Sequence, residues 1–133
     1  RISMSMKKLV TAVLIAASLS ACVAAPTRLE PDAFLLLKEG RVSPTNVTAF
    51  ANCLFDGFEG AHAMITNVRA RQQRRADGYR VESLVGGRSV IVSADVFDDG
   101  RVQLFEAKAA ALINTTGERE YFDRCLKQYG VSK

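Results

Sequence analysis

The fold is decided by residues 79–96, which read YRVESLVGGRSVIVSADV. On both sides of the Gly86-Gly87 pair, hydrophobic or small side chains alternate with the other residues, as they do along a β-strand with one buried face. Two consecutive glycines suit the positive φ angles of a tight turn. The stretch therefore predicts a β-hairpin, with one strand over 79–85 and the next over 90–96.

Two further stretches flank this hairpin. Upstream, residues 64–71 alternate in the same way, which predicts a strand. Downstream, Asp98-Asp99-Gly100 has the composition of a turn and leads into a short alternating run over 102–105. We therefore expect a four-stranded antiparallel meander with one apolar face and one mixed face.

The segment before the meander predicts a helix. Ser43 can cap a helix whose first residue is Pro44. Hydrophobic residues then recur at helical spacing until Gly57 and Gly60, which we expect to end the run. The pattern predicts an amphipathic helix over about 44–58, with Cys53 beside its hydrophobic stripe.

Residues 31–40 leave two alternatives open. Pro31 suits the first position of a helix and Gly40 suits the position just after its end, which indicates a short helix. The run Leu35-Leu36-Leu37 also fits the start of an edge strand.

The C-terminal segment predicts a second helix. Thr115 and Glu118 match a capping box, in which the two side chains bond opposite backbone amides. A hydrophobic stripe that includes Cys125 then continues to Gly130. The predicted fold class is α+β in the order helix-β-β-β-β-helix, with both helices packed on one face of the sheet.

The first 21 residues differ in kind from the rest. Basic residues at positions 1, 7 and 8 precede an apolar run over 9–19, and no acidic residue occurs before Glu30. At about 11 residues this run is too short for the roughly 20 that a membrane-spanning helix needs. We therefore expect a cleaved signal peptide over residues 1–21.

The sequence Leu19-Ser20-Ala21-Cys22 follows the apolar run and resembles a lipobox, the processing signal of bacterial lipoproteins. The resemblance implies that cleavage makes Cys22 the new N-terminus, carrying fatty acyl chains such as palmitate. Because Val23 stands where an Asp would retain a lipoprotein in the inner membrane, the resemblance implies the periplasmic face of the outer membrane. The alternative is an ordinary signal peptide that happens to contain Cys22.

Domain organisation and charge follow from this leader. We expect residues 22–32 to be a lipidated tether and residues 33–133 to form a single small periplasmic domain. The formal net charge is +4, but removing the three basic residues of the leader from the total of 18 leaves 15, against 14 acidic residues. A role in binding nucleic acid therefore has little support.

The chain contains three cysteines. If Cys22 carries lipid, Cys53 and Cys125 remain as a pair in an oxidising compartment, which predicts a disulfide between the two helices. The alternative is two free, buried thiols. A catalytic pairing of a cysteine with His62 is disfavoured, because nothing nearby in the sequence would activate a thiolate.

Arginine supplies the one basic cluster, and the candidate partner-binding residues are Arg69, Arg71, Arg74, Arg75 and Arg80. They could bind acidic groups of an envelope protein or an anionic lipid through charge-assisted hydrogen bonds. The alternative is a solvated strand end whose charges prevent edge-to-edge aggregation.

Residues 95–106 resemble a calcium-binding EF-hand loop at Asp95, Asp99, Gly100 and Glu106. The flanks alternate like strands, however, so we expect a hairpin turn and no metal site. His62 has no carboxylate or cysteine at ligand spacing, and we expect no catalytic residue and no cofactor.

These observations favour a lipid-anchored accessory or assembly protein of the cell envelope without catalytic activity. Its expected contact surface is the sheet face not covered by helices, which carries Arg80, Glu82, Leu84, Ile91, Phe97 and Phe105. One alternative is an inhibitor of a cell-wall-degrading enzyme, acting through residues 74–78 or 98–100. Another is a hydrolase, which would require His62 to meet a carboxylate.

Overall fold

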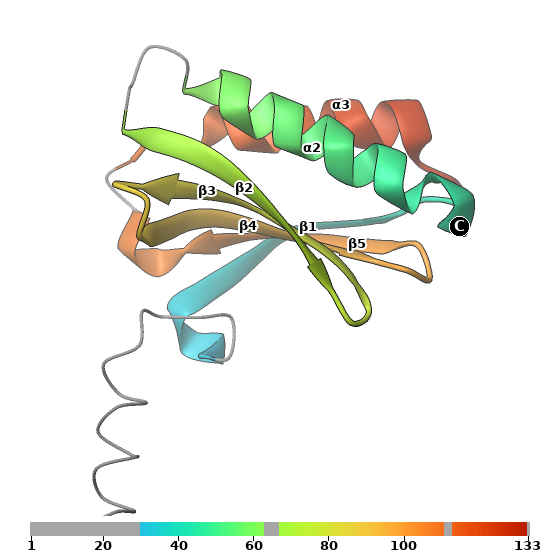
Figure 1. Ribbon diagram of the computed structural model, residues 1–133, viewed down its shortest axis with the longest axis horizontal. Coiled ribbons are helices and arrows are strands. Elements are labelled where there is room, and N and C mark those ends of the chain that lie inside the picture. Colours follow the sequence, from blue (N-terminus) through green and yellow to red (C-terminus); the bar gives the residue numbers. More distant parts are fainter. Residues whose placement is uncertain (1–29, 63–66, 111–112, 133) are drawn as a thin grey trace, which may run out of the picture.

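The computed structural model describes residues 30–62, 67–110 and 113–132 (Figure 1). Within them, one antiparallel sheet contains the strands β1 (Phe34–Arg41), β2 (Val68–Arg75), β3 (Gly78–Val85), β4 (Ser89–Phe97) and β5 (Arg101–Ala107). The α-helices are α2 (Val47–Ala61) and α3 (Thr116–Tyr129), and short 3-10 helices occupy η1 (Pro31–Ala33), η2 (Pro44–Asn46) and η3 (Lys108–Ala110). None of these helices is long and apolar enough to cross a membrane.

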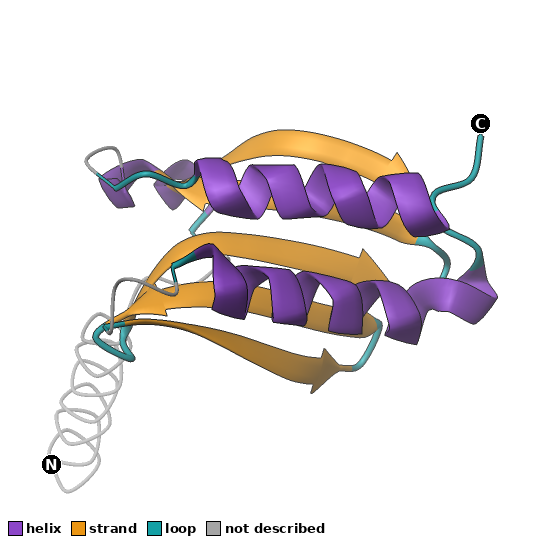
Figure 2. Cartoon of the chain, turned by 90° about the horizontal axis from the view of Figure 1, so that it is seen from above, coloured by secondary structure: helices purple, strands orange, loops and turns teal. Residues whose placement is uncertain are grey.

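Both α-helices lie on the same face of the sheet, with their axes side by side (Figures 1 and 2). The α+β class and this one-sided arrangement confirm the prediction. The strand order is β1-β5-β4-β3-β2, so β2 to β5 form the predicted meander and β1 is added at its edge. The sheet therefore has five strands where the sequence predicted four.

Strand β1 replaces the short helix expected over residues 31–40. Only Pro31–Ala33 is helical, and Phe34–Arg41 pairs antiparallel with β5, with an irregularity between Leu36 and Lys38. Of the two alternatives left open by the sequence, the edge strand is confirmed. Its physical reason is the unpaired edge that β5 would otherwise present, since a strand at that position satisfies a full row of backbone hydrogen bonds.

The hairpin turns follow the prediction with one shift. Gly86 and Gly87 adopt φ angles of 61° and 70°, the left-handed conformation that the turn between β3 and β4 requires. Strand β2 continues to Arg75, which pairs with Gly78, so only Ala76 and Asp77 form the turn between β2 and β3. The predicted strand over 64–71 was therefore placed too early, and its residues 64–66 lie outside the described residues.

The hydrophobic core fills the space between the helices and the sheet. Phe50 and Leu54 of α2 and Phe122 of α3 are fully buried, and the rings of Phe50 and Phe122 meet edge-to-face with centroids 5.8 Å apart. From the sheet, the buried side chains that join this cluster include Val81, Val92, Ala94, Val96, Val102 and Leu104. Packing of these residues places the outer surfaces of α2 and α3 in solvent, next to one another.

Helix α2 runs past the glycines that were expected to end it. It extends to Ala61, and Gly57 lies in its interior where Tyr121 of α3 packs against it. A Cβ at position 57 would lie 2.4 Å from the Tyr121 ring, far inside van der Waals contact. Gly57 therefore allows close approach of the two helices and does not terminate α2.

Helix α3 begins where predicted, but not with the predicted cap. The Thr115 hydroxyl donates to the Glu106 carboxylate, and the Glu118 carboxylate accepts from His62. The backbone N–H of Thr116 instead donates to Asn114 Oδ1 at 3.0 Å. The capping-box prediction is therefore wrong, because tertiary partners compete for both side chains.

Candidate functional site

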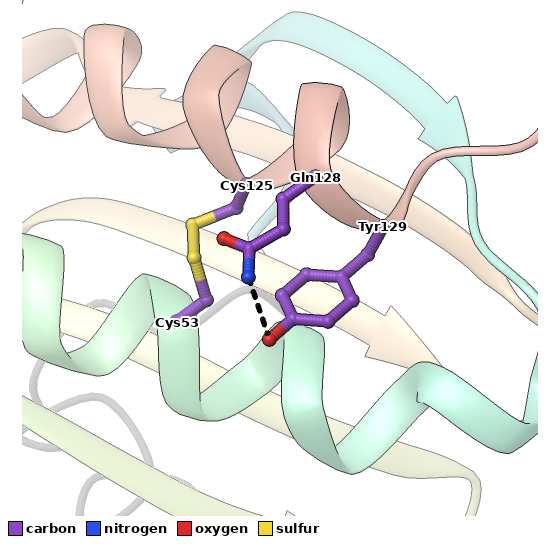
Figure 3. The surroundings of a disulfide bond; sticks show 4 residues. All are labelled: Cys53, Cys125, Gln128 and Tyr129. Atoms are coloured by element: carbon purple, nitrogen blue, oxygen red, sulfur yellow. Dashed lines mark hydrogen bonds between the residues drawn. A yellow bond between two sulfur atoms is a disulfide. The ribbon is translucent and has the colours of Figure 1, made fainter.

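Cys53 and Cys125 form the predicted disulfide, which connects α2 to α3 (Figure 3). Their Cα atoms are 6.0 Å apart, in the usual range for a disulfide. The two residues are 72 positions apart in the sequence, and a cross-link over that separation stabilises a chain by about 4 kcal/mol in the loop-entropy model. Neither sulfur is a free thiol, so neither can act as a catalytic nucleophile.

A groove lies between the helices beside this disulfide. Its volume is about 630 Å³, within the range of ligand-binding sites. Helix α2 supplies one wall and helix α3 the other. The lining residues are Ala49, Asn52, Cys53, Asp56, Gly57, Tyr121, Arg124, Gln128 and Tyr129.

The α3 wall of the groove combines aromatic and polar groups. The guanidinium of Arg124 lies 5.0 Å from the centre of the Tyr121 ring, a cation–π contact. The Gln128 side-chain amide donates to the Tyr129 hydroxyl at 3.2 Å, and both side chains lie next to the disulfide (Figure 3). This site was not predicted from the sequence, although Tyr121, Arg124 and Gln128 have the i, i+3, i+7 spacing of one helix face.

The arginines predicted to bind a partner lie on β2 and β3, where most of them meet carboxylates. Arg71 donates to Glu82 at 2.7 Å and Arg80 to Asp95 at 2.8 Å. Arg69 lies 3.3 Å from Glu59. The five arginines are not gathered in one patch, because Arg74 lies opposite Tyr79 on the face covered by the helices while Arg71 lies on the other face. Four of the five, Arg69, Arg71, Arg74 and Arg80, are paired with carboxylates.

Arg74 makes the most complete of these ion pairs. Its two terminal nitrogens donate to the two oxygens of Asp98, each at 2.8 Å. These hydrogen bonds raise the pKa of Arg74 and lower the pKa of Asp98. The neighbouring Asp99 accepts from the backbone and side chain of Arg101, and these bonds lower its pKa as well.

The segment resembling a calcium-binding loop forms the hairpin between β4 and β5, as expected. Its carboxylates point to separate partners, since Asp95 binds Arg80, Asp98 binds Arg74 and Asp99 binds Arg101. Among the described residues there is no group of three or more His, Cys, Asp or Glu side chains arranged to hold a metal ion. The geometry is that of a hairpin stabilised by ion pairs.

His62 meets a carboxylate, which the hydrolase alternative requires. Its Nε2–H donates to both oxygens of Glu118, each at 2.8 Å. The pair joins the end of α2 to the first turn of α3, and the two side chains are only 6% and 0% exposed. A substrate would have no access to a pair so deeply buried, so the contact is best explained as a buried polar link between the helices.

The sheet face that the helices leave uncovered differs from the expected contact surface. Glu82 and Leu84 are each 4% exposed and Ile91 is 3% exposed. Arg80 and Phe97 are half-buried. The expected apolar patch is therefore not exposed at Leu84 and Ile91. Ile91 instead belongs to the buried hydrophobic cluster.

Comparison with known proteins does not assign the chain to a family. No protein-family model, curated protein or solved structure matches it.

Proposed function

We propose that this protein is a lipid-anchored accessory protein of the bacterial outer membrane, and that it binds an envelope protein in the groove between α2 and α3 without catalysing a reaction. The charged and apolar leader and the lipobox-like sequence ending at Cys22 support the anchor. Of the three cysteines, two are joined in the disulfide, which leaves Cys22 for acylation. Two or three acyl chains hold a protein firmly at a membrane.

The groove beside the disulfide is the observation that carries the binding role. It presents Tyr121, Tyr129 and Arg124, and tyrosine and arginine are among the residues that contribute most to protein–protein binding. Its two walls are covalently joined, so a partner meets a preformed surface and little conformational entropy is lost.

The chemistry of the groove indicates what kind of segment would fit. Asp56 on the α2 wall and Arg124 on the α3 wall offer an exposed acceptor and an exposed donor. The rings of Tyr121 and Tyr129, which also line the groove, favour an aromatic or aliphatic side chain as an anchor. A partner at the arginines of β2 and β3 would first have to displace their carboxylates, so the groove is the better site.

Site-specific photo-crosslinking in cells tests this proposal. A photoreactive residue at Gln128 should crosslink one envelope protein, whereas the same residue at Lys127, which is exposed on α3 but does not line the groove, should not. Equal crosslinking at both positions, or none at either, would contradict binding in the groove. Intact-mass measurement of the membrane-extracted protein tests the anchor separately, since it should begin at Cys22 and carry acyl chains.

We keep inhibition of a cell-wall-degrading enzyme as a second candidate. The two segments considered for that role lie side by side, because the N–H of Asp98 donates to Asp77 O at 2.8 Å and Arg74 binds Asp98. Two turns joined by hydrogen bonds lose little conformational entropy when they bind in a catalytic cleft. A lysozyme-inhibition assay tests this role, and inhibition that survives substitution of Asp98 and Asp99 would exclude these turns as the inhibitory element.

A further inference from the structure

The start of β1, the end of β5 and the turn between β3 and β4 lie at one end of the sheet (Figure 1). A second cavity opens among them. Its volume is about 380 Å³. The residues that line it are Ala33, Phe34, Arg88, Ser89, Val90, Ala107, Lys108 and Ala109. This site lies on the sheet and shares no residue with the groove between the helices.

The interior of the cavity is apolar. Phe34 and Ala107 are cross-strand neighbours in the β1–β5 pair and are only 8% and 7% exposed, while Val90 of β4 is half-buried. Side chains of this kind hold hydrocarbon, because burying apolar surface is the main source of affinity in such pockets.

Two exposed cations line the same cavity. Arg88 lies in the turn between β3 and β4, and Lys108 begins η3. Among the described residues neither forms an ion pair, in contrast to Arg69, Arg71, Arg74 and Arg80. Two positive charges beside an apolar cavity are complementary to an anionic head group attached to a hydrocarbon chain.

The neighbouring surface is also apolar. Leu35 and Leu36 directly follow Phe34 and are 49% and 48% exposed, and they are two of the three large hydrophobic residues that are exposed in the described part of the chain. A lipid ligand could therefore enter beside an apolar rim.

We propose that this cavity binds a single-chain anionic lipid. The acyl chain lies against Phe34, Val90 and Ala107, and its carboxylate or phosphate is bound by Arg88 and Lys108. This binding is independent of the partner groove and of the acyl chains proposed for Cys22.

The test is a lipid titration of the full chain in a nonionic detergent, followed by native mass spectrometry. The probes are oleate, lysophosphatidylglycerol and zwitterionic lysophosphatidylcholine. We expect one bound molecule of an anionic probe per chain, with affinity at least tenfold higher than for lysophosphatidylcholine. Comparison of oleate with lysophosphatidylglycerol shows whether a carboxylate or a phosphate is preferred.

Variants locate the binding site. The double variant R88E/K108E should weaken binding of the anionic probes at least tenfold, whereas R41E/K127E, which makes the same charge change at exposed positions outside the cavity, should not. The variant V90W fills the cavity and should abolish uptake of all three lipids, with folding checked by circular dichroism. Equal affinity for the zwitterionic and anionic probes, or equal loss in both double variants, would overturn the proposal.

Discussion

Two carboxylates in this protein accept hydrogen bonds of the same length in opposite surroundings. Glu118 accepts from His62 at 2.8 Å at the junction of α2 and α3, where its side chain is fully buried. Asp98 accepts from Arg74 at 2.8 Å between two hairpin turns, where both side chains are about half exposed, at 49% and 53%.

The difference shows that distance alone does not set what an ion pair or hydrogen bond contributes. A buried carboxylate has lost its water, so removing its partner leaves a group with no other source of hydrogen bonds. An exposed carboxylate regains water when its partner is removed, and salt screens the attraction that remains. The helix junction should therefore be sensitive to substitution, and the hairpin turns tolerant of it.

The largest effect is expected for the cross-link at the helix junction. Replacing Cys53 and Cys125 together with Ala should lower the free energy of unfolding by about 4 kcal/mol, because the unfolded chain regains the freedom of the closed loop. Urea denaturation measures the loss. The wild-type protein under reducing conditions should show the same shift, and an unchanged midpoint would mean that the disulfide does not constrain the unfolded state.

A double-mutant cycle on His62 and Glu118, set beside one on Arg74 and Asp98, sharpens the comparison of the two carboxylates. Glu118→Ala should cost about 3 kcal/mol, since it leaves the buried His62 without its acceptor. The matching cycle on Arg74 and Asp98 should give a much smaller coupling, which falls further in 1 M salt. Equal coupling energies in the two cycles would break the argument from burial.

The close approach of the helices gives an intermediate effect. Gly57→Ala should destabilise the fold by about 2 kcal/mol, because the new methyl group would overlap the Tyr121 ring. Gly60→Ala is the matched control: its Cβ would meet only the Tyr121 hydroxyl, at 3.9 Å. That variant should be neutral or slightly stabilising, because Ala favours the helix. Thermal unfolding of both variants decides between close packing and a general intolerance of substitution.

The smallest expected effect is the response of the hairpin turns to acid. The pKa values of Asp98 and Asp99 are lowered in the folded protein, so these groups bind protons less readily there than in the unfolded chain. Their contribution is present above the ordinary aspartate pKa of about 4 and is lost as the pH falls below it. The D98N/D99N double variant should therefore lose less stability than the wild type between about pH 5 and pH 2. A parallel decline of the two proteins would show that these carboxylates contribute nothing.

The sequence predicts the parts of this fold that depend on local patterns. Alternation over 79–85 and 90–96 and the glycine pair between them gave the central hairpin, and hydrophobic spacing around Cys53 and Cys125 placed both residues on facing helices. These signals are local because side-chain periodicity and turn conformation are set within a few residues.

Features that depend on distant partners were not predictable in the same way. Strand β1 exists because β5 needs a neighbour, although its own residues also suit a helix. Thr115 and Glu118 have the spacing of a capping box, but Glu106 and His62 bind them instead. The groove and the lipid cavity likewise combine side chains from separate elements, so no single stretch of sequence contains either site.

The strand order has a consequence for how the molecule assembles. Among the described strands, β1 pairs only with β5, which ends at Ala107, so β1 cannot join the sheet until β5 has been made. Contacts between segments so far apart in sequence form slowly, because a large loop must close first. The meander of β2 to β5 can form earlier from neighbouring segments, leaving Phe34, which is only 8% exposed in the folded protein, accessible to chaperones until β1 docks.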